Sequence, residues 1–493
     1  MHGPREQNCA AMLRRLAIPS LTIVFACSSP PSRTFLSRDD LLEPTACQGC
    51  HQDHYEEWAG SMHAYAADDP VFIAMNRRGQ RETHGALGTF CVNCHAPMAV
   101  REGATKDGLN LARLPKKLKG VTCYFCHSVD QVNGTHNNPL HLADDGVMRG
   151  GIADPFRSGR FHDAAYSSLL DRNRAESARA CGACHDIVTP HEGAIERTFR
   201  EWQSSVFSTS GGSTCGQCHM AQSTTPRAIA QIPDAPLRRP HSHTFAAIDV
   251  AVVPFPDVER QRQLVQSLLD TTLQTALCVE PLGAASRIRV ILDNVAAGHS
   301  FPSGSAQDRR SWVEIVAYSG GKVIYSSGVV PAGASPTELA DRDLWLLRDC
   351  IFDASGAQVS MFWQAASSEG NSLPPLITFD ASDSRYYEAH KVKAYPASGE
   401  LPTTPDHVTL RVQLQPIGLD VLDDLIATGD LDPSVRAASS TFTVGPALEW
   451  TQATATHVYI DHQTGNRVYC ATNTNLNVLA DKFPAAVRSR CAP

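Results

Sequence analysis

The chain has 493 residues, of which 42% are hydrophobic and 19% charged, and its formal net charge is −8. This length exceeds what one ordinary hydrophobic core holds, so we expect two domains with flanking tails. The acidic balance argues against nucleic acid as a partner, because nucleic-acid-binding domains carry a clustered basic excess. The 16 cysteines and 20 histidines are more than a reducing compartment favours, unless the cysteines hold something.

Residues 1–27 are typical of an export signal. Two arginines precede an apolar run at 16–26, which is too short for a membrane span. No stretch of the sequence reaches the eighteen consecutive apolar residues that a spanning helix needs. The run ends in Val-Phe-Ala-Cys, which resembles the lipobox of bacterial lipoproteins and predicts lipidation of Cys27. Ordinary cleavage after Ala26 is the alternative, and Met12 is an alternative start.

A polar linker at 28–45 leads to a first domain at 46–245. This domain is rich in Cys, His and Gly, and its sequence predicts short helices only at 52–66 and 194–207. Such a chain cannot fold mainly around an apolar core of its own. Something other than its side chains must fill the centre.

The character changes after about residue 245, where apolar alternation separated by Gly, Pro and Asp predicts antiparallel strands. We expect a mostly β, sandwich-like domain at 246–450 and a tail at 451–493. The expected strands are 287–294, 312–318, 322–325 and 408–414, and the expected helices are 257–277 and 418–428.

Five copies of Cys-x-x-Cys-His occur in the first domain. This is the attachment motif of c-type haem, in which two thiols bond one porphyrin and the next imidazole binds its iron. Zinc sites would use the Cys pairs two by two, and five is odd. The sequence therefore predicts five covalent haems. The thiols are Cys47, Cys50, Cys91, Cys94, Cys123, Cys126, Cys181, Cys184, Cys215 and Cys218, and the proximal imidazoles are His51, His95, His127, His185 and His219.

Four cysteines outside the motifs and the leader form an even set, which in an exported chain predicts disulfides. A bond between Cys470 and Cys491 would close a loop in the tail. That pairing leaves Cys278 with Cys350.

The sixth iron ligand must come from elsewhere in the chain. Methionine is scarce, with 8 residues, so we expect two histidines on most irons. A near-repeat, EWAGSMH at 57–63 and EWQSSVF at 201–207, keeps Glu, Trp and Ser but has His63 in one copy only. We therefore predict that His63 is a distal ligand.

The other distal positions are assigned more loosely, to His136, His162, His243 and His299. His141 remains an alternative to His136, and His241 to His243. His299 lies in a tight Gly/Pro turn of the second domain, and its ligation would dock that domain onto the haems; a plain turn histidine is the alternative.

With these motifs in hand, the first domain resembles the tetrahaem c-type cytochromes that serve hydroxylamine oxidation. The likeness spans about residues 45–245 and is carried by the CxxCH…EWxxSxH frame at 47–63, CVNCHAP at 91–97 and CGACHDIV at 181–188. The second domain is similar to the haem-free β module of some larger multihaem cytochromes, through GHSFPSG at 298–304 and DDLIATGDLD at 423–432.

The resemblance implies closely packed haems that pass electrons to redox partner proteins, other cytochromes among them. Five motifs rather than four mean that a ligand set cannot be transferred as a whole. We expect an electron-transfer protein without catalytic residues, held in the periplasm or at the outer membrane or cell surface by its lipid. The alternative is an oxidoreductase acting on nitrite, hydroxylamine or a sulfur oxyanion at one haem with an open iron position.

Overall fold

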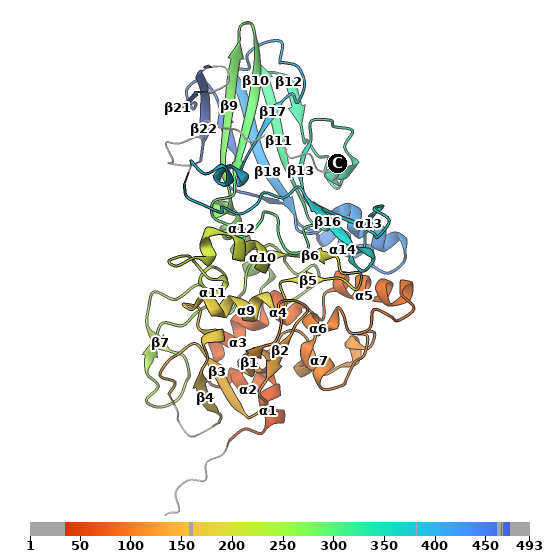
Figure 1. The fold of residues 1–493 in the computed structure, drawn as a ribbon, viewed down its shortest axis with the longest axis vertical. Coiled ribbons are helices and arrows are strands. Elements are labelled where there is room, and N and C mark those ends of the chain that lie inside the picture. The colour runs from red at the N-terminus through yellow and green to blue at the C-terminus, as the bar shows by residue number, and fades with distance from the viewer. Residues whose placement is uncertain (1–34, 157–160, 381, 461–464, 466, 474–493) are drawn as a thin grey trace, which may run out of the picture.

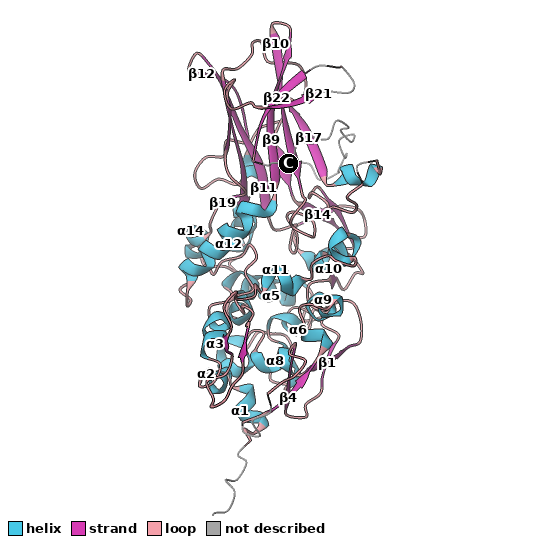
Figure 2. Cartoon of the chain, turned by 90° about the vertical axis from the view of Figure 1, so that its left-hand side faces the viewer, coloured by secondary structure: helices cyan, strands magenta, loops and turns pink. Residues whose placement is uncertain are grey.

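The computed structural model describes residues 35–156, 161–380, 382–460, 465 and 467–473. Short helices gather in one half of the molecule and long strands in the other (Figures 1 and 2). The expectation of a helical and irregular region followed by a β-rich one is confirmed. Cys27, with the rest of the proposed signal, and Cys491 lie outside the described residues.

The half of the molecule that carries the five CxxCH motifs, called the motif-bearing half below, is built from short helices joined by irregular segments. Its helices are α1 (Arg38–Leu42), α2 (Pro44–Gln48), α3 (Gln52–Ala59), α4 (Met62–Tyr65), α5 (Pro70–Glu82), α6 (Val92–His95), α7 (Pro97–Arg101), α8 (Cys123–His127), α9 (Ala178–Gly182), α10 (Thr198–Ser204) and α11 (Cys215–His219). Paired short strands complete it: β1 (Val129–Val132) with β2 (Leu140–Leu142), β3 (Val147–Gly150) with β4 (Asp163–Tyr166), β5 (Ile187–Val188) with β6 (Ala194–Ile195), and β7 (Arg227–Ala228) with β8 (Leu237–Arg238).

The helix expected at 52–66 is present as α3 and α4. The one expected at 194–207 is shorter, because β6 occupies its first residues. Two motifs lie on single-turn helices with the same start: the hydroxyls of Thr122 and Thr214 accept backbone N–H groups of α8 and α11. These caps fix the direction in which each motif histidine leaves its helix.

Two antiparallel sheets face each other in the β-rich half. The strands run in the orders β17-β10-β9-β22-β21 and β12-β11-β18-β19, with β13 on β11 and β20 on β18. A common apolar core joins Leu277 and Val290 of the first sheet to Val313 and Leu410 of the second, as in a sandwich.

The elements of this half extend the expected ones. The strands are β9 (Gln274–Leu282), β10 (Ala285–Asp293), β11 (Arg310–Ser319), β12 (Lys322–Ser327), β13 (Trp345–Leu347), β14 (Asp349–Phe352), β15 (Gln358–Val359), β16 (Ser367–Gly370), β17 (His390–Tyr395), β18 (His407–Gln415), β19 (Phe442–Thr443), β20 (Leu448–Trp450), β21 (His457–Ile460) and β22 (Arg467–Thr472), and the helices are α12 (Val258–Thr272), α13 (Leu419–Ala427) and α14 (Ser434–Ala438). The helix expected at 257–277 ends early, because the next residues form a buried strand of the first sheet.

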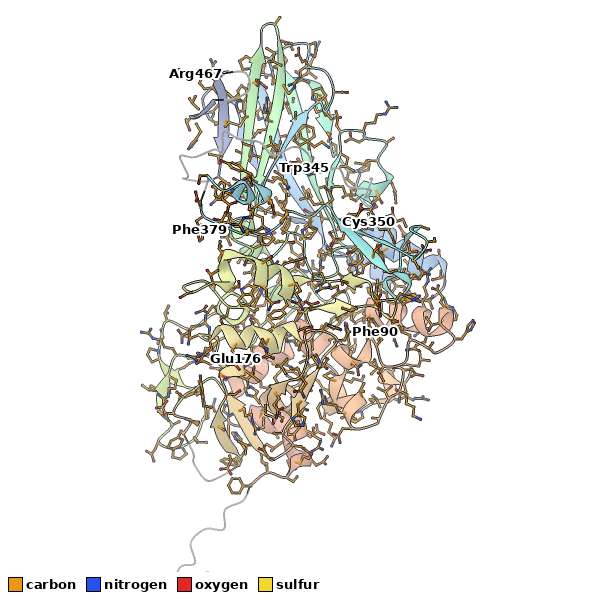
Figure 3. The ribbon with its side chains drawn as sticks, viewed as in Figure 1. Phe90, Glu176, Trp345, Cys350, Phe379 and Arg467 are labelled. Carbon is orange, nitrogen blue, oxygen red and sulfur yellow. A yellow bond between two sulfur atoms is a disulfide. The ribbon has the colours of Figure 1, made fainter. Side chains whose placement is uncertain are left out.

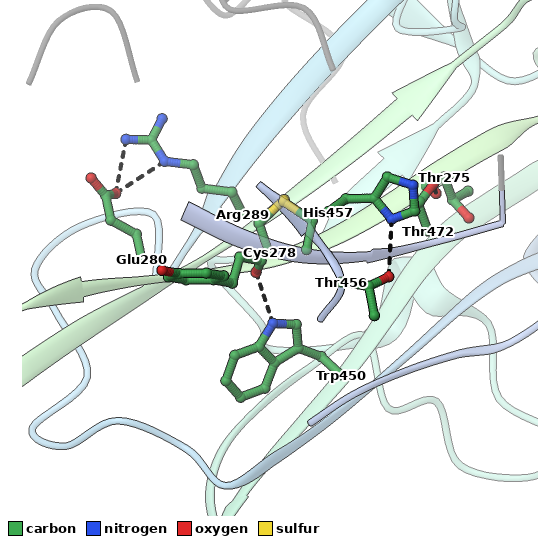
Figure 4. Close-up of a disulfide and its surroundings, with 10 residues drawn as sticks. Thr275, Cys278, Glu280, Arg289, Trp450, Thr456, His457 and Thr472 are labelled. Atoms are coloured by element: carbon green, nitrogen blue, oxygen red, sulfur yellow. Dashed lines mark hydrogen bonds and ion pairs between the residues drawn. A yellow bond between two sulfur atoms is a disulfide. The ribbon is translucent and has the colours of Figure 1, made fainter. Parts of the chain in front are cut away.

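The expected disulfides are wrong. Cys278 is bonded to Cys470 (Figure 4), which excludes both the Cys278–Cys350 and the Cys470–Cys491 pairs. The physical reason is that the chain after residue 451 returns to the first sheet as β21 and β22, and β22 sets Cys470 directly opposite Cys278 on β9. Cys350 is also disulfide-bonded.

The two halves share an apolar boundary. Leu422 and Leu425 of α13 belong to the same buried cluster as Phe72 of α5, and Arg78 of α5 forms an ion pair with Asp424 at 2.7 Å. The β-rich half therefore completes the core of the motif-bearing half. Among the described residues, no helix combines the length and apolarity that a membrane span requires.

Candidate haem-binding site

One cavity of about 1440 Å³ runs through the motif-bearing half. Cysteine and histidine side chains of all five motifs line it, and so does the turn around His299 from the β-rich half. Phe90 (Figure 3) lines the cavity near the boundary, with its ring 6.1 Å from that of Phe362, which also lines it. Both halves therefore enclose a single space that reaches every motif.

Backbone carbonyls orient four of the five motif imidazoles. An imidazole that donates its Nδ1 hydrogen in this way leaves Nε2 as the free metal-binding atom, which is the usual arrangement behind a metal-bound histidine. The Nδ1–oxygen distances are 2.7 Å from His51 to Ile229, 3.0 Å from His95 to Ala66, 2.5 Å from His127 to Arg149 and 2.8 Å from His219 to Ala246.

Four motif imidazoles face a second imidazole across the cavity. Because a metal–imidazole bond is about 2 Å long, two imidazoles on opposite sides of one iron have ring centres roughly 6 Å apart. Four centre-to-centre distances match this value: 6.3 Å for His51–His162, 6.3 Å for His63–His185, 6.4 Å for His127–His243 and 6.4 Å for His219–His299. His54 also lies 6.3 Å from His51, but it is only three residues from His51 in the sequence, whereas His162 comes from a distant segment.

Burial keeps three of these facing imidazoles neutral, which is the form that binds metal. Loss of hydration, with smaller contributions from neighbouring histidines, lowers the pKa of His63 to about 3. Burial also lowers the pKa of His243 and of His299. Each side chain is therefore available as a ligand at neutral pH.

The structure does not bring His136 to the cavity. It lies on an exposed loop where its Nδ1 contacts the hydroxyl of Thr135 at 3.1 Å, and its alternative His141 is likewise exposed and pairs with Asp130 at 2.7 Å. Both were expected from their closeness in sequence to the third motif, but this loop points outward. The sequence also left open whether His241 or His243 is a ligand. In the structure His243 faces a motif imidazole, that of His127.

His95 is the exception among the motif imidazoles. Within the described part of the chain, no histidine ring faces it at the distance seen in the four pairs. Phe72 instead stacks on its ring, with centres 3.9 Å apart and planes within 3° of parallel. The second motif thus has a rigid proximal side but no histidine opposite.

Thiols from different motifs touch and show which motifs are neighbours. Cys47 lies beside Cys123, Cys94 beside Cys184, and Cys181 beside Cys215, in each case close enough for one thiol to shift the pKa of the other. The first motif therefore adjoins the third, and the fourth adjoins both the second and the fifth. Cys181 also lies close enough to Cys126 to contribute to the raised pKa of that thiol, which links the third motif to the fourth.

Buried charges that line the cavity were not anticipated. Asp308 and Arg309 are 6% and 8% exposed, and Arg309 pairs with Asp249 at 2.8 Å. Burial raises the pKa of Asp308 to about 7 and that of Glu196, a neighbour of Cys91, above its usual range. In the sequence, Asp308 and Arg309 belong to an Asp-Arg-Arg run shortly after the His299 turn. Asp308 can therefore hold a proton beside the cavity near neutral pH.

Comparisons with known proteins agree with this geometry. Residues 46–128, which hold the first three motifs, match the family described as cytochrome c554 and c-prime. The structure is similar to the crystal structure of a penta-haem cytochrome c552 from Thermochromatium tepidum, with a TM-score of 0.56 and 18% identity, over 82% of this chain and 97% of that chain. The fold is that of a multihaem c-type cytochrome. Because residues 46–245 make up less than half of the chain, the likeness extends into the β-rich half. No curated protein matches.

The comparisons support covalently bound c-type haem and an electron-transfer role that involves redox partners. The donor set fits this cofactor: paired thiols on one turn, an oriented imidazole after each pair, and a continuous cavity. The resemblance to the cytochromes of hydroxylamine oxidation stays a prediction from the sequence.

Proposed function

We propose that this chain is an exported cytochrome that binds five c-type haems covalently and carries electrons along them to and from redox partner proteins. The observation that carries the proposal is the set of four imidazole pairs, each at the spacing of two ligands on one iron, in a cavity lined by all five motifs. Bound haem supplies the one-electron chemistry. The chain holds the haems in place and keeps water from their faces.

In this proposal the distal ligands are His162 for the first motif, His243 for the third, His63 for the fourth and His299 for the fifth. All four pairs join residues that lie at least 80 positions apart in the sequence. His299 in particular comes from the β-rich half, so its ligation would tie the two halves together through iron. This gives the haem-free half a structural reason to be present.

The thiol contacts support a route through neighbouring motifs. It runs from the first motif to the third, the fourth and the fifth, with the second beside the fourth. Electrons that enter at the first motif would leave near the fifth, close to the β-rich half. Transfer in the opposite direction would follow the same route.

Export and anchoring belong to the same proposal. Covalent haem attachment to CxxCH motifs and a disulfide both suit an oxidising compartment, and a lipid on Cys27 would hold the protein at a membrane. A Cys27→Ala variant should lose membrane association while its haem spectrum is unchanged. Membrane association that persists in this variant would count against the anchor.

The ligand assignment is tested by replacing each distal histidine with alanine in the haem-loaded protein. His63→Ala, His162→Ala, His243→Ala and His299→Ala should each convert one of five ferric haems from low spin to high spin, seen by electron paramagnetic resonance. His136→Ala is the matched control and should leave the spectrum unchanged. A low-spin spectrum that persists in all four variants would contradict the proposal.

A second candidate function is oxidoreductase chemistry on nitrite, hydroxylamine or a sulfur oxyanion. One observation favours it: no described histidine faces His95, and Glu196, whose pKa burial raises, lies close to Cys91 of that motif. Addition of nitrite or hydroxylamine to the wild-type protein distinguishes the two candidates. A carrier leaves the spectrum unchanged, whereas an enzyme shows a high-spin fraction that shifts.

A further inference from the structure

The Glu-Trp-x-x-Ser repeat occupies equivalent places in the structure. The first copy, at 57–61, spans the end of α3 after the first motif, and the second, at 201–205, lies on α10 after the fourth motif. The two serines have the same role: the hydroxyls of Ser61 and Ser205 each accept a backbone N–H of the turn that follows. The repeat is therefore a repeated piece of structure.

Each tryptophan of the repeat holds the approach to another motif. The indole Nε1 of Trp58 donates to the carbonyl of Val121 at 2.7 Å, and that of Trp202 donates to the carbonyl of Ser213 at 2.9 Å. Both carbonyls belong to the residue two positions before the first cysteine of a motif, the third motif in one case and the fifth in the other. Both indoles are buried.

Each glutamate of the repeat holds the segment that faces the same motif. Oε2 of Glu57 accepts the backbone N–H of His243 at 2.8 Å. Oε2 of Glu201 accepts the backbone N–H of Ser300, the residue after His299, at 3.0 Å. His243 faces the third-motif imidazole and His299 the fifth-motif imidazole.

Each Glu-Trp dipeptide thus contacts both sides of a single haem position. The indole binds the segment before the motif, and the carboxylate binds the segment that carries the opposite histidine. The thiol contacts repeat in the same way, because Cys47 touches Cys123 and Cys181 touches Cys215. In each case the motif before the dipeptide adjoins the motif that the dipeptide grips. Two equivalent two-motif units therefore exist within the chain.

We propose that Glu57 and Glu201 are positioning residues that hold the distal imidazoles of the third and fifth haems on their irons. The inference rests on the proposed function, since it takes His243 and His299 as ligands. A hydrogen bond to a carboxylate is stronger than one between neutral groups, and here it acts on the backbone of the ligand or of its neighbour. Its loss frees the imidazole to leave iron more often.

The two sites differ in how many other contacts hold the ligand. The carbonyl of His299 also accepts the side-chain amide of Asn294 at 2.7 Å, so that turn keeps an anchor when Glu201 is removed. His243 has its own N–H bound by Glu57 directly. We expect the larger effect from Glu57.

The test titrates the ferric, haem-loaded protein with cyanide, which competes with a distal imidazole for iron. Because a hydrogen bond to a charged group is worth a factor of about ten or more in an equilibrium constant, E57A should raise the cyanide affinity of one haem about tenfold over wild type. E201A should raise that of a different haem by less. E57Q keeps a neutral acceptor oxygen and should fall between wild type and E57A, and it carries the test if E57A does not mature.

A double-mutant cycle separates positioning from general loosening. E57A combined with H243A should bind cyanide as H243A alone does, because the imidazole that Glu57 holds is already gone. The matched control is E56A, since the Glu56 carboxylate is exposed on the same helix and accepts only the Gln52 amide.

Three results would overturn the role of Glu57: an E57A titration identical to that of wild type, a further increase in the double variant, or an equal change in E56A. An H243A protein with unchanged cyanide binding would instead overturn the ligand assignment on which the inference rests. The two failures are therefore distinguishable.

Discussion

The interiors of the two halves of this molecule are built differently. In the β-rich half, alternating apolar residues of two sheets pack against one another and fill the interior with side chains. In the motif-bearing half, short helices surround a continuous cavity whose walls carry thiols and imidazoles. Even its apolar cluster is completed by α13 of the other half. From this difference we expect that the β-rich half can fold by itself, whereas the motif-bearing half needs its cofactor.

The largest test of this comparison is to withhold haem attachment. Without covalent haem, the motif-bearing half should stay unfolded, because the cavity would leave apolar walls in contact with water. The β-rich half should keep its sheets. Limited proteolysis should then leave a resistant fragment that spans the strands from residue 274 to 472.

Equal resistance of both halves in haem-free protein would contradict the comparison. Loss of both halves together would show that the β-rich half also depends on the cofactor. The haem-loaded protein is the control and should resist proteolysis throughout.

A second test removes the disulfide from the half that needs no cofactor. Replacing Cys278 and Cys470 together by serine should lower the free energy of unfolding of the β-rich half by about 2–5 kcal/mol, because the bond closes a long loop in the unfolded chain. The haem spectrum should not change. Thermal unfolding followed by circular dichroism measures the loss, and a shifted haem spectrum would show that the halves are not independent.

A third test uses Asp349 on β14, whose pKa burial raises to about 6 although the Ser372 hydroxyl donates to it. Because the folded state binds this proton more tightly than the unfolded state, Asp349 contributes most stability below about pH 4, and that contribution is lost as the pH rises through about 6.

Asp349→Asn removes this titration. Between pH 4 and 7 the wild type should therefore lose on the order of 3 kcal/mol of stability relative to the variant. Urea unfolding of both proteins at the two pH values measures the difference. A constant difference across this range would contradict the assignment.

The smallest effect is expected at the boundary between the halves. Asp424→Asn removes the ion pair with Arg78. Because the Asp424 side chain is 39% exposed, the free energy of unfolding should fall by less than about 1 kcal/mol. The apolar contact of α13 with α5 should keep the halves together. A loss well above that value, measured by urea unfolding, would show that charge rather than apolar packing holds the boundary.

Much of the fold follows from local patterns. The expected strand at 408–414 lies inside β18, and the one at 287–294 overlaps β10 except for its last residue. The helix α13 begins one residue from its expected start. The disulfides could not be predicted, because pairing depends on which strand lies beside β9. That neighbour, β22, comes from a segment 192 residues later in the chain.

The candidate site divides in the same way. The five motifs are local and were evident from spacing. The structure places His63, His162, His243 and His299 opposite motif imidazoles, and their role as iron ligands stays a prediction. His136 shows the limit: nearness to a motif in sequence says nothing about the direction of its loop. The glutamates of the repeat were visible as letters, but their partners, His243 and Ser300, lie about 100 residues or more away and only the fold reveals them.

The central claim is that five motifs and four opposed histidines place five irons in one cavity. Anomalous diffraction at the iron absorption edge, from crystals of the haem-loaded protein, tests this most directly. The account predicts five iron peaks, four of which lie midway between the imidazoles of His51 and His162, His63 and His185, His127 and His243, and His219 and His299. Fewer than five peaks, or irons that lie away from these midpoints, would contradict it.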